Sequence, residues 1–168
     1  DKYVFTYQGD GDLAAIGIAE TLHAINRGEN ILIVFMNNAV YGMTSGQMAP
    51  TTLPGMHTTT SPDGRDVSYY GAPIKVSELM SNLPGSFYVT RQAVHNPNAV
   101  RRTKKALLNA FKYQQLHKGT CLVEIIGNCP SNWKMTPLEA TKFIDEEMVK
   151  TFPLGDIKIP NEEDLKIY

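Results

Sequence analysis

Two short polar motifs stand where a cation and a phosphate would bind in an α/β fold. Gly9-Asp10-Gly11-Asp12 follows one apolar run and Asn37-Asn38 follows the next, with a helical segment between them. In a strand–helix–strand unit, the turns that leave two parallel strands lie at the same edge of the sheet. We therefore expect side-chain oxygens of Asp10 and Asn38 to converge on one Mg²⁺ ion, with diphosphate oxygens as further ligands.

Each motif alone has a purely conformational explanation. Gly-Asp-Gly and paired Asn are both common in turns, because glycine accepts positive φ and Asp or Asn bonds its own turn backbone. The order and spacing of the two motifs, each directly after an apparent parallel strand, make the combination specific. The elements that position them must therefore form a parallel sheet.

Apolar periodicity predicts alternating strands and helices. Strands are expected at 2–7, 31–36, 87–90 and 120–126, and helices at 13–26, 76–83, 97–117 and 136–149. This alternation predicts a three-layer α/β/α fold with a mainly parallel sheet and ligands at the carboxyl ends of the strands. Residues 39–73 lack periodicity, so we expect a functional or disordered loop there.

The bulk properties are those of one globular domain. The chain has 168 residues, 42% hydrophobic and 20% charged, with a net charge of −1 that gives no indication of nucleic-acid binding. No apolar run approaches the roughly 20 residues of a membrane helix. The cysteines, Cys121 and Cys129, form no disulfide framework, so we expect a reducing, cytoplasmic setting.

The boundaries of the domain are also predicted from pattern. We expect a binding domain over 1–150 and a C-terminal tail over 151–168 without clear periodicity. The apolar run at 3–7 is typical of an interior strand, yet it follows only Asp1 and Lys2. We therefore expect the chain to be a C-terminal fragment of a longer protein.

Longer motifs make the interpretation more specific. Residues 36–47 read Met-Asn-Asn-Ala-Val-Tyr-Gly-Met-Thr-Ser-Gly-Gln, and Ala-Pro-Thr-Thr follows at 49–52. Further on stand Cys-Pro-Ser-Asn-Trp at 129–133, Met-Thr-Pro at 135–137 and Phe-Pro-Leu-Gly at 152–155. With the Gly-Asp-Gly…Asn-Asn motif of thiamine-diphosphate enzymes, these segments resemble the β subunit of the 2-oxoacid:ferredoxin oxidoreductases over about residues 1–160.

The resemblance implies a set of ligands for Mg²⁺-thiamine diphosphate. Asp10 and Asn38 would give side-chain oxygens and Val40 its backbone carbonyl, with two diphosphate oxygens and a water completing six ligands. The other cofactor contacts expected are Gly9, Gly11, Asp12, Tyr41, Gly42, Met43, Thr44 and Gln47. Asp12 is expected to cap the following helix, with a supporting role behind the ligands as the alternative.

Two positions depart from the family pattern. Pyruvate-specific relatives resemble Tyr-Ser-Asn-Thr-Gly-Gly-Gln in this loop, whereas this chain has Met43 in place of the Asn near the thiazolium and substrate. Met43 either favours a different acyl chain or packs beneath the loop. We expect a branched-chain 2-oxoacid such as 2-oxoisovalerate, ahead of 2-oxoglutarate and pyruvate. Ser45 replaces a Gly that would accept positive φ.

The resemblance also implies groups that this chain does not supply. Cys129 would be the fourth thiolate of a [4Fe–4S] cluster in the full-length protein, since one thiolate cannot hold a cluster. Cys121, within a strand, is expected to be inert. The Glu that activates the aminopyrimidine belongs to a partner subunit, so no catalytic residue is assigned here and the fragment alone is expected to be inactive.

The implied activity is oxidative decarboxylation of a 2-oxoacid to acyl-coenzyme A with reduction of ferredoxin, in an oligomer with α and other subunits. One alternative is a non-catalytic cofactor-binding or assembly domain. Another is a Mg²⁺-dependent phosphoryl-transfer enzyme with Asp10 as nucleophile, which the lack of a nearby Lys disfavours. The basic run at 101–105 is either a solvated helix face or a docking patch for ferredoxin.

Overall fold

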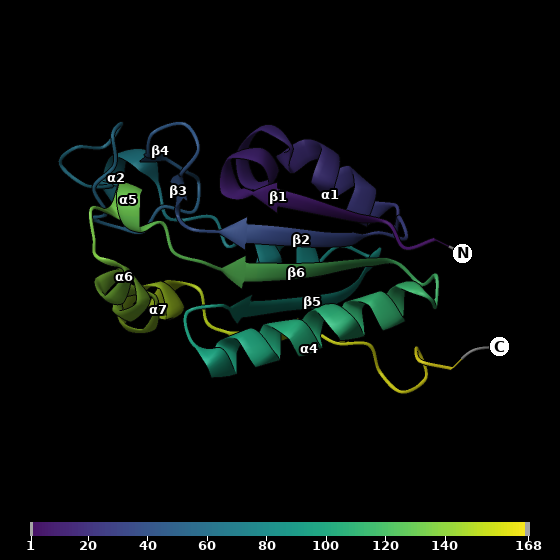
Figure 1. Cartoon of the computed structure of the whole chain (residues 1–168). Coiled ribbons are helices and arrows are strands. Elements are labelled where there is room, and N and C mark those ends of the chain that lie inside the picture. The colour runs from purple at the N-terminus through teal and green to yellow at the C-terminus, as the bar shows by residue number, and fades with distance from the viewer. Residues whose placement is uncertain (1, 167–168) are drawn as a thin grey trace.

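The computed structural model describes residues 2–166 and contains one five-stranded sheet in the order β1-β2-β6-β5-β7 (Figure 1). Its strands are β1 (Phe5–Gly9), β2 (Leu32–Asn37), β6 (Thr120–Ile126), β5 (Ser86–Ala93) and β7 (Gly155–Lys158). The first four are parallel, and β7 pairs antiparallel with β5. The predicted mainly parallel sheet is confirmed.

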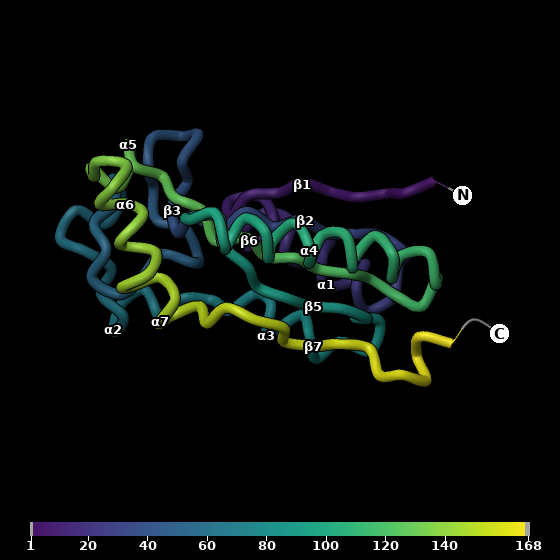
Figure 2. The backbone as a smooth tube through the Cα atoms, turned by 60° about the horizontal axis from the view of Figure 1, so that its bottom comes forward, coloured from purple at the N-terminus to yellow at the C-terminus, as the bar shows by residue number. Residues whose placement is uncertain are grey.

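Helices cover both faces of this sheet. Around it lie η1 (Asp12–Ile16, a π-helical turn), α1 (Ile18–Asn26), α3 (Val76–Ser81) and α4 (Pro97–Gln114). The long helix α4 packs on one face, while α1 and α3 pack on the other (Figure 2). The three-layer α/β/α architecture expected from the alternation of patterns is therefore present.

The two halves of the core follow from strand geometry. Successive side chains of a strand point to opposite faces. In β2, Ile33 and Phe35 pack with the α1 and α3 side, whereas Leu32 and Val34 pack with the α4 side. Because both faces are covered, the run reads as continuously apolar.

A third group of elements gathers beyond the carboxyl ends of the parallel strands, on the left in Figure 1. It contains β3 (Val40–Tyr41), β4 (Gln47–Met48), α2 (Val67–Tyr70), α5 (Pro130–Trp133), α6 (Pro137–Phe143), η2 (Ile144–Met148) and α7 (Val149–Thr151). Thr136 and Glu139 form a capping box that opens α6. No helix within residues 2–166 is long and apolar enough to cross a membrane.

The expectation of an interior first strand is wrong for the described residues. β1 begins at Phe5 rather than residue 2 and lies at an edge of the sheet, with Phe5 57% and Tyr7 68% exposed. The apolar composition of this segment suggested burial, but β1 pairs with a neighbouring strand, β2, on one side only. The rings of Tyr3 and Phe5 instead pack edge-on against Phe111 of α4.

The tail is more structured than its lack of periodicity suggested. Gly155–Lys158 forms β7, and the hydroxyl of Thr90 in β5 donates to the Gly155 carbonyl at 3.1 Å. Four residues are too few to show a period, so the pairing partner, not the local pattern, makes this strand. Asp1 and residues 167–168 of the expected domain and tail lie outside the described residues.

The segment 39–73 contains only the short elements β3, β4 and α2, and the side chain of Arg65 links its parts. This side chain is buried, and its Nη1 donates to the carbonyls of Ala49, Pro50 and Thr52 at 2.8–3.1 Å. Its Nε donates to the Gly71 carbonyl at 3.0 Å. The Arg65 guanidinium thus joins residues 49–52 to Gly71, so this segment is an ordered part of the fold rather than a disordered loop.

Candidate functional site

Asp10 lies at the carboxyl end of β1 and is only 4% exposed. Its Oδ1 accepts from the Gly11 N–H at 3.1 Å, and its Oδ2 accepts from the Val40 N–H at 3.0 Å and the Thr51 hydroxyl at 3.2 Å. Burial raises the pKa of the Asp10 carboxyl to about 6, although these donors favour the ionised form. A nearby cation would lower that pKa and stabilise the carboxylate.

The side chain of Asn38 reaches Asp10 across the sheet edge, as the motif spacing predicted. The amide nitrogen of Asn38 donates to Asp10 Oδ2 at 3.1 Å and to the Val40 carbonyl at 2.6 Å. In the opposite orientation the amide oxygen faces these same two acceptors and accepts only from the Val40 N–H, at 3.3 Å. A cation would offset the repulsion among the three oxygens in that orientation, and carboxylate, amide and carbonyl oxygens are ligands that Mg²⁺ prefers.

The Asn38 turn has an unusual backbone that its neighbours hold in place. Ala39 has a φ of +59°, a conformation that disfavours side chains with a Cβ. The Thr52 hydroxyl donates to the Ala39 carbonyl at 2.6 Å, and the Trp133 indole donates to the Asn38 carbonyl at 3.1 Å. The turn that carries Asn38 and Val40 is therefore fixed from two sides.

A cavity of about 510 Å³ opens in front of Asp10 and Asn38. Its walls are Gly9, Asp10, Gly11, Asp12, Ile16, Met36, Asn38, Tyr41, Gly42, Met43 and Thr44. Nearly all the cofactor-contact residues predicted from sequence thus face one space. A volume of this size suits one cofactor-sized ligand.

Two predicted contacts, Val40 and Gln47, do not line the cavity. Val40 is buried, and only its backbone groups reach Asp10 and Asn38. Gln47 accepts a hydrogen bond from the Thr44 hydroxyl at 2.6 Å. Thr44 therefore holds its own turn, and it also lines the cavity.

The predicted cap at Asp12 is wrong. The helical segment begins with Gly11 as its N-cap, without any side-chain cap, and Asp12 is the first residue of η1. Asp12 is exposed and lies on the cavity wall. Gly11 packs closely on Tyr41, because a Cβ there would lie 3.1 Å from the Tyr41 ring.

Met43 does not pack beneath the loop, because its side chain is 99% exposed at the cavity mouth. Ser45 and Gly46 have φ values of +85° and +84°, so the position where the family has Gly does adopt positive φ. A Cβ on Gly46 would come within 2.7 Å of Asn132 Oδ1. The loop is therefore pressed closely against the segment that follows β6.

Cys129 follows β6 and lies beside this loop. The Asn132 amide donates to Cys129 Sγ at 3.1 Å and to the Gly42 carbonyl at 3.0 Å. Cys129 is partly exposed, whereas Cys121 is buried in β6 and burial raises its thiol pKa to about 12. The two sulfurs thus occupy very different environments, as the strand position of Cys121 predicted.

Sequence reasoning missed Thr51 and Asn132, and it missed the role of Arg65 in ordering the loop. Their contacts join residues far apart in sequence, so no local pattern identifies them. Within residues 2–166 no group of three His, Cys, Asp or Glu could hold a metal ion. The candidate cation site depends instead on one carboxylate, one amide and one carbonyl.

Comparison with known proteins identifies the family. Residues 1–125 match the family described as "Thiamine pyrophosphate enzyme, C-terminal TPP binding domain". The chain belongs to this family. The match includes the two strands that precede Asp10 and Asn38, and it includes the segment 39–73 that leads to α3. The thiamine-diphosphate-binding fold expected from the two motifs is therefore confirmed.

Among thiamine pyrophosphate enzymes, the chain is similar to subunits of 2-oxoacid oxidoreductases. It is 45% identical over 158 residues to the ketoisovalerate oxidoreductase subunit VorA of Methanothermobacter thermautotrophicus, covering 94% of this chain and 33% of that protein. It is 35% identical over 143 residues to the 2-oxoglutarate synthase subunit KorB of Archaeoglobus fulgidus, covering 85% of this chain and 49% of that one.

A solved structure shares the fold. It is a 2-oxoglutarate:ferredoxin oxidoreductase from Magnetococcus marinus with 2-oxoglutarate, coenzyme A and succinyl-CoA bound. The TM-score is 0.68 at 27% identity, covering 87% of this chain and 45% of that one. The resemblance expected from the motifs is thus confirmed, and the chain spans about a third to a half of the length of these relatives.

Proposed function

We propose that this chain is the thiamine-diphosphate-binding part of the β subunit of a 2-oxoacid:ferredoxin oxidoreductase. The observation that carries the proposal is the convergence of Asp10 Oδ2, the Asn38 amide and the Val40 carbonyl, two of which belong to residues that line the cavity. These groups would hold Mg²⁺, with Asn38 presenting its amide oxygen when the ion is bound. The diphosphate would supply two of the remaining ligands.

The rest of the cavity would receive the cofactor. Gly9, Gly11 and Gly42 keep the walls free of side chains near the diphosphate, and Tyr41 packs on Gly11. Thiamine diphosphate supplies the carbanion chemistry of 2-oxoacid decarboxylation when it is bound. This chain's own residues position the diphosphate and its Mg²⁺. The proton-transferring Glu is proposed to come from a partner subunit.

Cys129 is proposed as a ligand of a [4Fe–4S] cluster in the complete protein. Its position supports this role, because a Cβ added to Gly42 would lie 3.3 Å from Cys129 Sγ and 3.4 Å from the Asn38 amide. The sulfur therefore lies directly behind the loop that carries Gly42 and lines the cavity. The cluster's other cysteines would lie elsewhere in the complete protein.

The substrate is proposed to be a branched-chain 2-oxoacid such as 2-oxoisovalerate. The similarity to the ketoisovalerate subunit is greater than that to the 2-oxoglutarate subunit. Met43 presents an apolar, exposed side chain at the cavity mouth, where it would contact an aliphatic acyl chain. We propose that the complete enzyme is a cytoplasmic oligomer whose other partners are coenzyme A and ferredoxin.

Calorimetric titration of thiamine diphosphate, with and without Mg²⁺, tests the cofactor assignment. We expect Mg²⁺-dependent binding that Asp10→Ala abolishes. Binding of a phosphate monoester or nucleotide in preference to thiamine diphosphate would contradict the proposal. The phosphoryl-transfer alternative already faces an obstacle, because three donors occupy the oxygens of Asp10 that would have to attack.

Turnover by the assembled complex tests the substrate. With a panel of 2-oxoacids and ferredoxin as acceptor, we expect the highest kcat/KM with 2-oxoisovalerate. Met43→Asn should lower that value for branched substrates more than for pyruvate, since it replaces apolar contact area with an amide. A complex that binds the cofactor but turns over no 2-oxoacid would favour the non-catalytic assembly role.

A further inference from the structure

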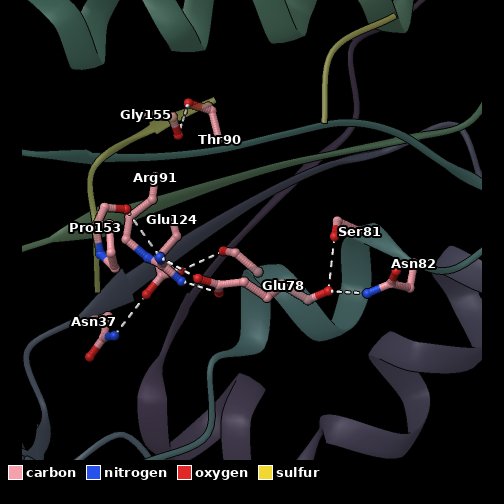
Figure 3. Close-up of polar contacts among 10 residues, drawn as sticks. Asn37, Glu78, Ser81, Asn82, Thr90, Arg91, Glu124, Pro153 and Gly155 are labelled. Carbon is pink, nitrogen blue, oxygen red and sulfur yellow. Dashed lines mark hydrogen bonds and ion pairs between the residues drawn. The ribbon is translucent and has the colours of Figure 1, made fainter. Parts of the chain in front are cut away.

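A network of buried ion pairs and hydrogen bonds links β5, β6 and α3 to Asn37, the residue before the turn that carries Asn38 and Val40 (Figure 3). Arg91 of β5 and Glu124 of β6 are paired in the parallel register, and Arg91 Nε donates to Glu124 Oε2 at 2.8 Å. The other two guanidinium nitrogens of Arg91 donate to Glu78 of α3. The side chains of Arg91 and Glu124 are 0% and 1% exposed, so both charges are removed from water.

The second oxygen of Glu124 connects this network to the turn that carries Asn38 and Val40. Glu124 Oε1 accepts from the Asn37 amide nitrogen at 2.8 Å, and the Asn37 amide oxygen accepts from the Ala39 N–H at 3.0 Å. Asn37 is fully buried. Because one partner accepts and the other donates, the amide of Asn37 has only one satisfied orientation.

The hydrogen bond from the Ala39 N–H to Asn37 acts on the backbone conformation of Ala39. Its positive φ sets the direction of the backbone between Asn38 and Val40, the two groups that face Asp10. A left-handed residue with a Cβ persists only where its surroundings hold it. The bond from its N–H to Asn37 supplies such a restraint from within the core.

A buried ion pair is weak support for stability, because desolvation offsets most of its attraction. Its directional hydrogen bonds, however, place the groups they touch with little freedom. Groups behind metal ligands orient them in this way in other metal sites. We propose that Glu124, held by Arg91, is a positioning residue that acts through Asn37 to aim Asn38 and Val40 at the metal. This inference rests on the proposed function.

A pair of matched alanine variants tests the inference. Asn37→Ala removes the bond to Glu124 Oε1 and the bond to Ala39. Ser77→Ala removes a different bond to the same carboxylate, because the Ser77 hydroxyl donates to Oε2, which keeps Arg91 as a partner. Both residues are fully buried, but Asn37→Ala removes more atoms and one more hydrogen bond, so the stability of each variant is measured separately.

The readout is the Mg²⁺ dependence of thiamine diphosphate binding to the complete complex. We expect Asn37→Ala to weaken the apparent Mg²⁺ affinity by about 10–100-fold, whereas Ser77→Ala changes it less than about twofold. Glu124→Gln, which keeps the shape but loses an acceptor, should resemble Asn37→Ala. Unfolding temperatures of all three variants separate folding from binding.

The outcomes distinguish this inference from the function on which it rests. If the wild-type complex shows no Mg²⁺-dependent binding, or Asp10→Ala does not change it, the proposed function fails and the inference fails with it. If the wild type binds and Asp10→Ala does not, but Asn37→Ala binds like the wild type, the inference alone is overturned. Equal losses in Asn37→Ala and Ser77→Ala would also overturn it, since they would reflect general destabilisation.

Discussion

Asp10→Asn should make the metal-free protein more stable at neutral pH while it removes cofactor binding. The carboxyl of Asp10 has a pKa of about 6 in the fold, raised by burial from 3.8. Protonation of this group therefore stabilises the fold. That stability is fully present below pH 3.8 and is lost as the pH rises through 6. The Asn variant has no such loss.

The shift sets the size of the effect. One pKa unit corresponds to about 1.4 kcal/mol, so ionising Asp10 costs the metal-free fold about 3 kcal/mol by pH 8. The variant loses the bond from the Gly11 N–H, which costs about 1 kcal/mol. We expect Asp10→Asn to be about 1–2 kcal/mol more stable than wild type at pH 8, and slightly less stable at pH 3.5.

Urea unfolding in chelator at the two pH values measures this difference. Asp63→Asn, at an exposed loop position, is the control and should change stability by less than about 0.5 kcal/mol at either pH. Saturating Mg²⁺-thiamine diphosphate should stabilise the wild type but not Asp10→Asn, which reverses their order at pH 8. A stability difference between Asp10→Asn and wild type that does not vary with pH would refute the reasoning.

Three further outcomes follow from the loop and the cysteines. Ser45→Gly should stabilise the fold by about 0.5–1 kcal/mol in urea unfolding, because Ser45 has a φ of +85°; destabilisation would show that the Ser side chain is needed there. Arg65→Met should cost at least about 3 kcal/mol and speed hydrogen exchange across residues 46–73, since several buried carbonyls lose their donor; unchanged exchange would contradict the role given to Arg65. A thiol reagent at pH 8 should label Cys129 and leave Cys121 intact in the folded metal-free chain, because Cys121 is buried with a pKa of about 12; equal labelling would contradict the buried strand position.

Much of the candidate site follows from local pattern. Two apolar runs separated by a helical period are enough to predict adjacent parallel strands, and the residue after each run then falls at the same sheet edge. Asp10 and Asn38 meet for this reason. Similarly, Ser45 adopts the positive φ that its replacement of a family Gly suggested. In both cases the structure is set by local preferences, namely the periodicity of a strand or helix and the φ angle of a single residue.

The supporting contacts could not be predicted in the same way. Thr51 reaches Asp10, and Asn132 joins the cofactor loop to Cys129, only because the fold brings distant segments together. The same holds for Glu124, which in the sequence is one polar residue within an apolar strand. A single Glu in such a run has no periodicity that reveals its partners.

The position of each strand in the sheet also depended on the whole fold. The aromatic run of β1 has the composition of an interior strand, but the order of pairing places it at an edge. β7 has almost no pattern of its own and forms because β5 offers it a partner. Composition and period describe what a segment can bury, whereas neighbours decide what it does bury. Local sequence therefore predicted which polar side chains meet at the sheet edge, and only the packed structure showed which residues hold them in place.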